Sequence, residues 1–264
     1  VYKRGTNFFL RPPQTPKSFR TITVVDRTHT LMAKSNPAIN PHTWKLPFNL
    51  YWGDPHIMNG AFWATPALKP PDHYRYARDT VGLDFAVVTD ICREPPYFDA
   101  DTKISFEEWE RAKKAAREFY QPDSFVTFAA YEYNEQWHGG HRNVYYANEE
   151  EAELFSWDDP GYNTPEKLWR ALKGKKAMTI PHHPVTLRIG QNWEHHDPQF
   201  QRLVEIYSGW GCSEGVGCQR PFTIPSDYGR RSVQAALARG YRLGFVAGSD
   251  THSGEVGGPA KTAV

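Results

Sequence analysis

The sequence contains few cysteines, no long apolar run and no excess of either charge. Only three of its 264 residues are cysteines, and no CxxC pair occurs, which argues against a cysteine zinc site. No apolar run approaches the roughly 20 residues that a helix needs to cross a bilayer. Lys and Arg total 31 against 30 Asp and Glu, so the bulk charge gives no strong nucleic-acid signal. No internal repeat or low-complexity tract is present.

The length fits one large domain, or one domain and part of a second, without a disulfide scaffold. Cys212 and Cys218 could close a small loop in an oxidising compartment, which would leave Cys92 unpaired. The chain begins at Val1 without a signal-peptide pattern and stops abruptly at Val264, which indicates a processed or incomplete chain. Localisation therefore stays open, and an extracytoplasmic site would be compatible with such a disulfide.

The first 46 residues differ in composition from the rest. Residues 1–46 are rich in Pro, Thr, Lys and Asn and contain one β-like stretch, Phe19–Val25. We expect them to form an irregular N-terminal arm or the last piece of an upstream β domain. Residues 47–264 are expected to form the main domain.

From residue 47 onward, short apolar strands alternate with helices, which indicates parallel β/α units. We therefore predict an α/β fold, and within that class a distorted, incomplete β/α barrel. The clearest helix is Phe106–Tyr120, with Ser105 and Glu108 at capping-box spacing before and inside its first turn. The other expected helices are Pro71–Thr80, Thr164–Leu172 and Ser232–Ala238, and the expected strands are Phe48–Trp52, Leu83–Thr89, Phe125–Tyr131, Val144–Tyr146, Ala177–Ile180, Leu203–Tyr207 and Leu243–Ala247.

Histidines and carboxylates gather where these strands end, which is the face that holds the active site of β/α barrels. Such side chains suit zinc, manganese or iron, and their number could hold one to three divalent ions. A carboxylate bridging two ions would offset their repulsion. Asp250-Thr251-His252 is the most specific pattern, because its spacing can put two ligands on one turn. The candidates are Asp54, His56, Asp90, Glu132, His141, His182, His183, Asp250 and His252.

Most of these positions also have a purely structural interpretation. A single aspartate after a strand is often a helix cap or a turn former, which applies to Asp54 and to Asp90. His182 and His183 could be one packed and one solvated imidazole. Glu205 lies inside an expected strand, where it could be a ligand or a salt-bridged interior residue.

The candidate residues belong to an ordered series of motifs. The series comprises Tyr51-Trp52-Gly53-Asp54-Pro55-His56, Gly82–Phe85 through Thr89-Asp90, Tyr131-Glu132 with Gly140-His141-Arg142-Asn143, Ile180-Pro181-His182-His183 and Gly248–His252. Taken as a set over about residues 47–264, it resembles the polymerase-and-histidinol-phosphatase (PHP) superfamily of metal-dependent phosphoesterases. It is most similar to an uncharacterised branch, domain of unknown function 3604. This resemblance implies a distorted β/α barrel that hydrolyses phosphate esters with two or three ions at the strand ends.

By resemblance, His56 is the first ligand of the opening motif and Glu132 is the bridging carboxylate. Two departures stand out, because Met58 and Ile91 occupy places where relatives have histidine, and neither side chain suits a hard ion. The site could then hold fewer ions, use Asp54, Asp90 or His182 instead, or have lost catalysis. The remaining ligands implied by the resemblance are His141, His183, Asp250 and His252.

The expected activity is hydrolysis of a small-molecule phosphate ester by metal-activated water. His182 or Asp250 would act as general base or acid. Arg142 or Arg93 would stabilise charge on the phosphoryl oxygens, or else form surface ion pairs. Two other functions stay open: hydrolysis of a carboxylic ester, amide or lactone, and a non-catalytic binding or assembly module.

Overall fold

The structure is a computed structural model that divides the chain into two compact units, Val1–Leu50 and Tyr51–Val264. It describes short strands of the first unit and, beyond them, residues 49–58, 68–90, 106–136 and 139–264. In the first unit, β1 (Phe9–Arg11), β3 (Thr23–Val25) and β4 (Leu31–Lys34) form an antiparallel sheet. A second antiparallel pair consists of β2 (Phe19–Arg20) and β5 (Ala38–Ile39).

The first sheet of the second unit contains β6 (Trp52–Ile57) between β7 (Phe85–Val88) and β14 (Thr262–Ala263). β6 pairs parallel with β7 and antiparallel with β14. The predicted strand Phe48–Trp52 is therefore wrong, because the strand starts where that prediction ends. The sequence pattern misled because Asp54 and His56 are polar, yet both are fully buried within the strand.

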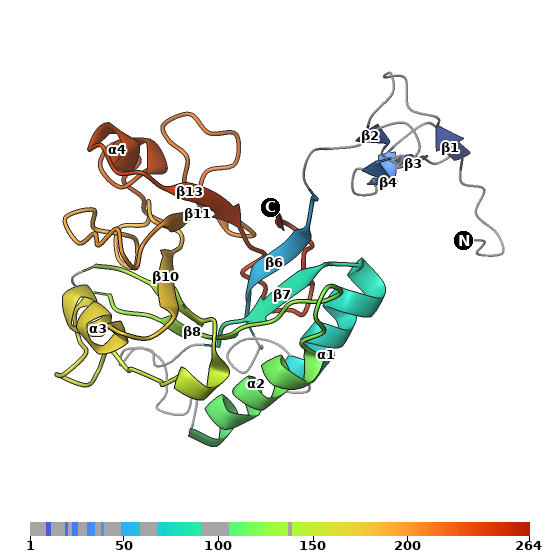
Figure 1. Ribbon diagram of the computed structural model, residues 1–264. Helices are drawn as coiled ribbons and strands as arrows, with labels where there is room; N and C mark the ends of the chain where they lie inside the picture. The colour runs from blue at the N-terminus through green and yellow to red at the C-terminus, as the bar shows by residue number, and fades with distance from the viewer. Residues whose placement is uncertain are drawn as a thin grey trace. The chain divides into compact units, whose positions relative to one another are not determined.

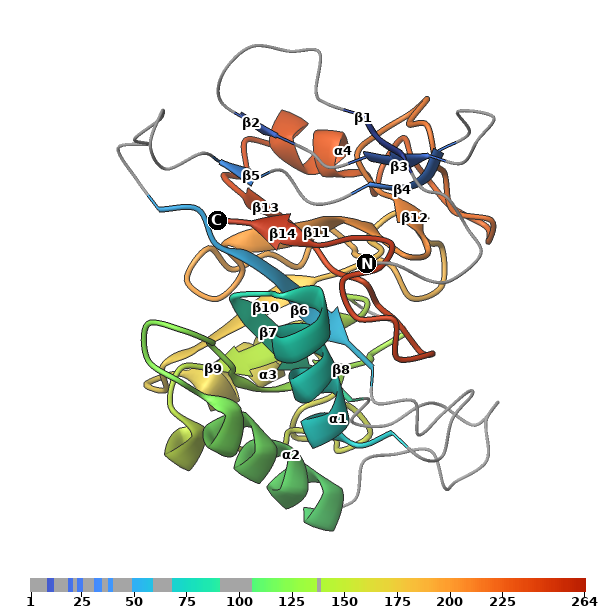
Figure 2. The same cartoon turned by 90° about the vertical axis from the view of Figure 1, so that its right-hand side faces the viewer.

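Two helical segments pack beside β7. α1 (Pro70–Arg75) continues into a π-helix (Tyr76–Val81) that ends at Gly82, whose φ of 71° suits a residue without a side chain. α2 (Phe106–Phe119) confirms the amphipathic helix and buries Trp109, Ala112 and Ala116. Its expected cap, Ser105, lies outside the described residues. Figures 1 and 2 show α1 and α2 lying together on one side of β7.

The second sheet is antiparallel throughout, which corrects the expectation of parallel β/α units. β9 (Arg142–Tyr146) runs between β8 (Ala129–Tyr133) and β10 (Ala177–Pro181). The predicted strand Phe125–Tyr131 is shifted along the chain, so that Glu132 lies inside β8 and opposite Asn143. Only eight residues separate β8 from β9, too few for the crossover connection that parallel strands need, so the two strands pair as an antiparallel hairpin.

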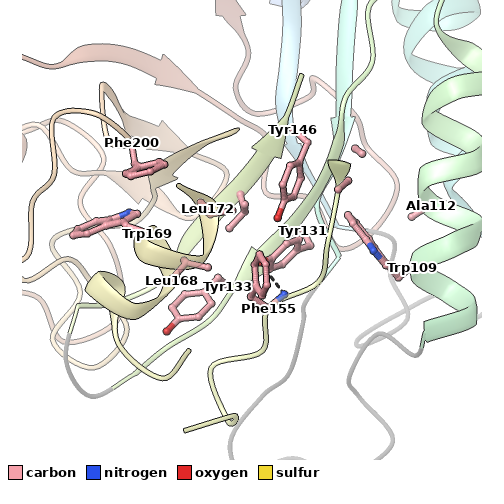
Figure 3. Packing of buried hydrophobic residues seen from close by; sticks show 13 residues of the cluster. Trp109, Ala112, Tyr131, Tyr133, Tyr146, Phe155, Leu168, Trp169, Leu172 and Phe200 are labelled. Carbon is pink, nitrogen blue, oxygen red and sulfur yellow. Dashed lines mark hydrogen bonds between the residues drawn. The ribbon is translucent and has the colours of Figure 1, made fainter. Parts of the chain in front are cut away.

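One face of this sheet packs against α3 (Pro165–Leu172), and Thr164, the first residue of the expected helix, is its N-cap. The Thr164 side chain accepts a hydrogen bond from Lys167 N–H. The packing is aromatic, and the Tyr131 hydroxyl also accepts a hydrogen bond from Phe155 N–H at 3.1 Å. Figure 3 shows this cluster, which includes Trp109, Tyr131, Tyr133, Tyr146, Phe155, Leu168, Trp169, Leu172 and Phe200.

The third sheet has β11 (Leu203–Ser208) between β12 (Gly211–Cys212) and β13 (Gly244–Ala247). β11 and β13 are parallel and are joined by α4 (Val233–Ala238), whose N-cap is Ser232, the first residue of the expected helix. A 3₁₀ turn (Glu149–Glu151) follows β9. Cys212 and Cys218 are free thiols, so the disulfide considered between them is absent, and Cys92 lies outside the described residues.

Isolated bridges connect the three sheets. Phe85 of β7 bridges Val126 just before β8, and Glu132 N–H donates to Asp90 O at 2.9 Å. Ile57 of β6 bridges Thr251, which follows β13. The α/β class is thus confirmed, but the described strands form separate small sheets and no closed barrel. Within the same residues, no helix is long and apolar enough to span a membrane.

Replacing Leu172 with Ala should lower the free energy of unfolding by about 2–5 kcal/mol, because the fully buried side chain would leave a cavity between α3 and the sheet. Urea unfolding measures this change. The control is Arg170→Ala, an exposed position of the same helix, which should shift the free energy by less than about 0.5 kcal/mol. Equal effects of the two variants would contradict the packing described here.

Candidate metal centre

Four buried side chains form a first group of potential metal ligands: Glu132, His141, His182 and His183. Glu132 lies in β8, His141 directly precedes β9, and the two other histidines directly follow β10. The antiparallel register explains their convergence, because alternate residues of the three strands share one face. Glu132 Oε1 lies 2.8 Å from His141 Nδ1 and 3.3 Å from His182 Nε2. The His182 and His183 rings are 4.2 Å apart.

A second group consists of His56, Glu205 and Asp250, which come from β6, β11 and the turn after β13. His56 Nδ1 lies 2.9 Å from Glu205 Oε2, and His56 Nε2 lies 3.5 Å from Asp250 Oδ1. Backbone bonds fix this arrangement, because Asp250 N–H donates to His56 O at 2.9 Å. The group thus ties the first sheet to the third.

Glu132 connects the two groups. Its Oε1 faces His141 and His182, while its Oε2 lies 3.8 Å from His56 Nε2. The His56 and His182 rings are 4.4 Å apart, so the second group begins where the first ends. A carboxylate that presents one oxygen to each group has the geometry of a bridging ligand.

Many donor atoms of the two groups are buried without a hydrogen-bond partner. Such atoms are rare in folded proteins, because each costs about 1–3 kcal/mol when it loses water. The short distances between Glu132 and the imidazoles are not accompanied by hydrogen-bond angles at the His141 and His182 nitrogens. Nitrogens and oxygens that lie close but do not aim at one another fit a shared cation. These atoms are His56 Nε2, both ring nitrogens of His141 and of His182, His183 Nδ1 and Glu205 Oε1.

The charge of the site also fits a cation. Glu132, Glu205 and Asp250 are all buried, and no lysine or arginine of the described chain forms an ion pair with them. Burial raises the pKa of Asp250 well above its usual range, further helped by the nearby Glu205 and Glu132 and opposed by His56. Burial opposes the charged form of Glu132, but His182, His141 and His56 outweigh it and hold its pKa well below its usual range.

The imidazoles are split between two charge states. Burial would lower the pKa of His56, but Asp250 and Glu205 raise it well above its usual value. Burial lowers the pKa of His182 to about 4 and that of His183 well below its usual value. His182 and His183 are therefore neutral at pH 7, which is the form that binds metals. Together, the donor atoms and the charge fit divalent ions.

Unusual backbone conformations occur at the site. His183 and Asp250 have φ of 33° and 48°, two of the three positive values among the described residues other than glycine. Residues with side chains rarely adopt such angles, and they concentrate at functional sites. Gly248 leaves no space for a side chain, because an added Cβ would lie 2.5 Å from His56 Cβ and 2.7 Å from Glu205 Oε2.

Of the sequence-predicted ligands, the structure brings His56, Glu132, His141, His183 and Asp250 into the two groups, together with His182. His252 lies at the rim, with Nδ1 3.8 Å from Asp250 Oδ1 and its ring edge-on to Trp210 at 5.5 Å. Asp90 contributes a backbone carbonyl that accepts from Glu132 N–H, and its side chain is outside both groups.

Asp54 binds the backbone instead of joining either group. Its Oδ1 accepts hydrogen bonds from Ser249 N–H at 2.9 Å and His56 N–H at 3.1 Å, and its Oδ2 accepts from Gly257 N–H at 2.8 Å. Burial raises the pKa of this carboxyl to about 6, although these bonds act in the opposite direction. Asp54 therefore holds the segment that carries Asp250 against β6.

Arg142 lies on the opposite face of the second sheet from Glu132. It is fully buried, so the surface ion pair considered for it does not exist. Its guanidinium donates to Gly139 O at 2.7 Å and lies over the Trp169 ring at 5.3 Å. The arginine fixes the turn before His141 and faces away from Glu132, which argues against the role expected for it at the phosphoryl oxygens. Arg93 and Ile91 lie outside the described residues.

Sequence reasoning left Glu205 undecided, and the structure puts it in the second group. The available signal was a carboxylate between the apolar residues Val204 and Ile206 of a strand, a position where burial demands a partner. Met58, at the place where the resemblance implies a histidine ligand, is buried with Sδ 3.9 Å from Thr89 Oγ1 and belongs to neither group.

Comparison with known proteins agrees with the motifs. Residues 91–207 match the family described as protein of unknown function DUF3604, which confirms the predicted resemblance. Uncharacterised proteins of Chlamydia trachomatis serovar D and Chlamydia pneumoniae are each 28% identical over 187 and 179 residues, about 66% of this chain. The matches span only 28% of the length of these relatives.

Similar solved structures include three that are at most 15% identical to the chain. PsfC from Pseudomonas syringae PB-5123 shares the fold with a TM-score of 0.51 at 15% identity, over 82% of each chain. A two-domain protein from Bacteroides vulgatus ATCC 8482, containing a predicted PHP-like metal-dependent phosphoesterase, has a TM-score of 0.44 at 14% identity, over 78% of this chain and 53% of its own. Endonuclease Q, solved with a 27-mer duplex, has a TM-score of 0.46 at 12% identity, over 78% and 50%.

The two roles considered for Asp54, metal ligand and acceptor of backbone hydrogen bonds, predict different stabilities for the metal-free protein. Asp54→Ala should lower the free energy of unfolding by about 2–5 kcal/mol in the presence of chelator, because three backbone N–H groups lose their acceptor. His252→Ala, at the rim, should change it by less than about 1 kcal/mol. If Asp54→Ala leaves the metal-free protein as stable as the wild type, Asp54 does not hold the Asp250 segment against β6.

Proposed function

We propose that residues 51–264 form a metal-dependent phosphoesterase that acts on a small-molecule phosphate ester. The observation that carries the proposal is the convergence of seven buried His, Glu and Asp side chains, with Glu132 between the two groups, unpartnered donor atoms, and no lysine or arginine of the described chain paired with the carboxylates. A packed structural cluster would be expected to satisfy these atoms within the protein. The motif resemblance supplies the reaction class.

Glu132, His141 and His183 of the first group would hold one ion, which leaves His182 for proton transfer, and His56, Glu205 and Asp250 would hold a second. Imidazole nitrogens and carboxylate oxygens suit zinc, manganese or iron, and the absence of thiolates argues against softer ions. When bound, such ions supply Lewis-acid polarisation of a phosphoryl oxygen and make water more acidic. Glu132, placed between the groups, would offset the repulsion between the two cations.

The protein's own side chains would move the protons. We assign this role to His182, one of the two residues that the sequence suggested, and keep Asp250 as a ligand, because a carboxylate bound to an ion has no proton to donate. Burial keeps the His182 imidazole neutral and able to accept a proton from the attacking water. The surrounding strands bury this imidazole, which excludes bulk water and strengthens every charge interaction with the substrate.

We further propose that the three sheets of residues 47–264 are sectors of one distorted barrel of the PHP type, with residues 1–46 as a separate unit. The bridges Phe85–Val126 and Ile57–Thr251 support this, because they link β7 to the start of β8 and β6 to the end of β13. β10 and β11 are also neighbours. In this arrangement, the ligands all come from one mouth of the ring.

Metal content tests the donor set directly. Protein purified without chelator should contain at least one equivalent of zinc, manganese or iron per chain by elemental analysis. Glu132→Gln should lose most of it, because it removes the oxygens that both groups share, while Glu205→Gln should lose the metal of the second group only. Glu194→Gln, an exposed control, should bind as the wild type does. No metal after loading would overturn the proposal and favour a binding or assembly module.

Activity tests the reaction class. The metal-loaded protein should release inorganic phosphate from aryl phosphates, and chelation should abolish the release. His182→Ala should lower kcat/KM by about 10²–10⁴-fold, the range for loss of a general acid or base, whereas Glu194→Gln should retain it. Release of carboxylic acids from esters, amides or lactones without phosphate release would reject the phosphoesterase in favour of the other hydrolase.

A further inference from the structure

A cavity opens beside the first ligand group, lined by segments that adjoin His141 and His183. It measures about 240 Å³ and is lined by Gln136, Gly140, Arg188, Gly190, Asn192 and Arg231, among others. None of the side chains assigned above to metal binding or proton transfer lines it. Its walls nevertheless come from the same chain segments that carry those ligands.

Three ligand-bearing segments continue directly into the cavity wall. Gln136 lies four residues after Glu132 in the chain, and Gly140 immediately precedes His141. Arg188 and Gly190 follow His183 in the next loop, which His141 secures by donating its N–H to Ile189 O at 2.8 Å. The cavity therefore lies next to the Glu132–His141–His183 side of the metal centre.

The wall is basic and lacks any acidic lining residue. Arg231 donates from Nη1 to Thr186 O and Gly190 O, both at 3.1 Å, and these neutral carbonyls orient the guanidinium without cancelling its charge. In the described chain, no carboxylate forms an ion pair with Arg231. Arg188 adds a second positive charge at the exposed edge. Guanidinium groups recognise carboxylates and phosphates in particular.

The inner wall supplies a hydrogen-bond acceptor and close backbone. Gln136 is 8% exposed, and its Oε1 is buried without a partner. A buried amide oxygen of this kind is costly unless a ligand hydroxyl or water donates to it. Gly140 has φ of 83°, and an added Cβ would lie 2.1 Å from Gly190 O, so no side chain can separate these two backbone walls.

We propose that this cavity binds a second acidic group of the substrate. Resting on the proposed phosphoesterase, the inference narrows its substrates to phosphate monoesters whose leaving group carries a carboxylate or phosphate, with a hydroxyl that donates to Gln136. The ester phosphate lies at the metal centre, while Arg188 and Arg231 hold the distant anion. Binding at two points fixes the position of the ester bond.

Matched substrates test this specificity. Alkyl phosphates with chains of two to six carbons are compared with the same compounds ending in a carboxylate, because the series covers different distances between the two sites. For at least one length, the carboxylate should raise kcat/KM by 10-fold or more, chiefly through KM. In Arg188→Gln and Arg231→Gln, the ratio of kcat/KM between the carboxylate-bearing and the plain compound should fall below 3. Arg242→Gln, an exposed control, should keep the wild-type ratio. Thermal unfolding shows whether Arg231→Gln folds, and Arg188→Gln removes an exposed group.

A binding measurement separates this inference from the proposed function. Inorganic phosphate is titrated into chelator-treated protein and followed by ³¹P line broadening, so the metal centre cannot hold the anion. Wild-type protein should bind phosphate at least 10-fold more tightly than Arg188→Gln or Arg231→Gln. Binding that depends on the arginines without any hydrolysis would reject the phosphoesterase but keep the anion site. No such binding and no preference for the acidic substrates would overturn the anion site, whatever the activity.

Discussion

The buried carboxylate of Glu132 is the constraint on which the rest of the second unit depends. One of its oxygens faces His141 and His182, and the other faces His56. Burying an ionised carboxylate costs several kcal/mol unless an opposite charge compensates for its lost hydration. No lysine or arginine of the described chain pairs with Glu132. Imidazoles compensate in part, and divalent ions would complete the compensation. The first and second sheets supply the imidazoles that face Glu132, and the third sheet contributes Glu205 and Asp250, which contact His56.

The scaffold around Glu132 is shaped for that convergence at some cost to regularity. The Asp54 carboxylate accepts hydrogen bonds from three backbone N–H groups, and these bonds hold the turn that bears Asp250 against β6. His183 and Asp250 adopt backbone angles that are unfavourable for side chains, and Gly248 must lack one. Arg142 stabilises the turn before His141 from the opposite face. These features suit a site in which placing the ligands matters more than an ideal sheet.

Helices and strand positions were largely predictable, since periodicity and caps such as Thr164 and Ser232 are local signals. The antiparallel second sheet was not, because pairing direction depends on tertiary contacts that an apolar run does not encode. Strand ends located most of the clustered ligands, among them His56, Glu132 and Asp250. The same rule could not tell Asp54, which binds backbone, from a ligand, nor place Arg142, whose face depends on register. Glu205 was undecided because a polar residue within a strand has no distinctive pattern.

Anomalous diffraction would show whether Glu132 binds a metal ion. Crystals grown with zinc and measured at the zinc absorption edge should give their strongest peak between the Glu132 carboxylate and the His141 imidazole, with a second peak beside His56, Glu205 and Asp250 if both groups are loaded. A loaded crystal with no peak at Glu132, or with Glu132 bonded only to imidazoles and water, would contradict metal binding by this carboxylate. In that case, the histidines and carboxylates would form a structural hydrogen-bond network.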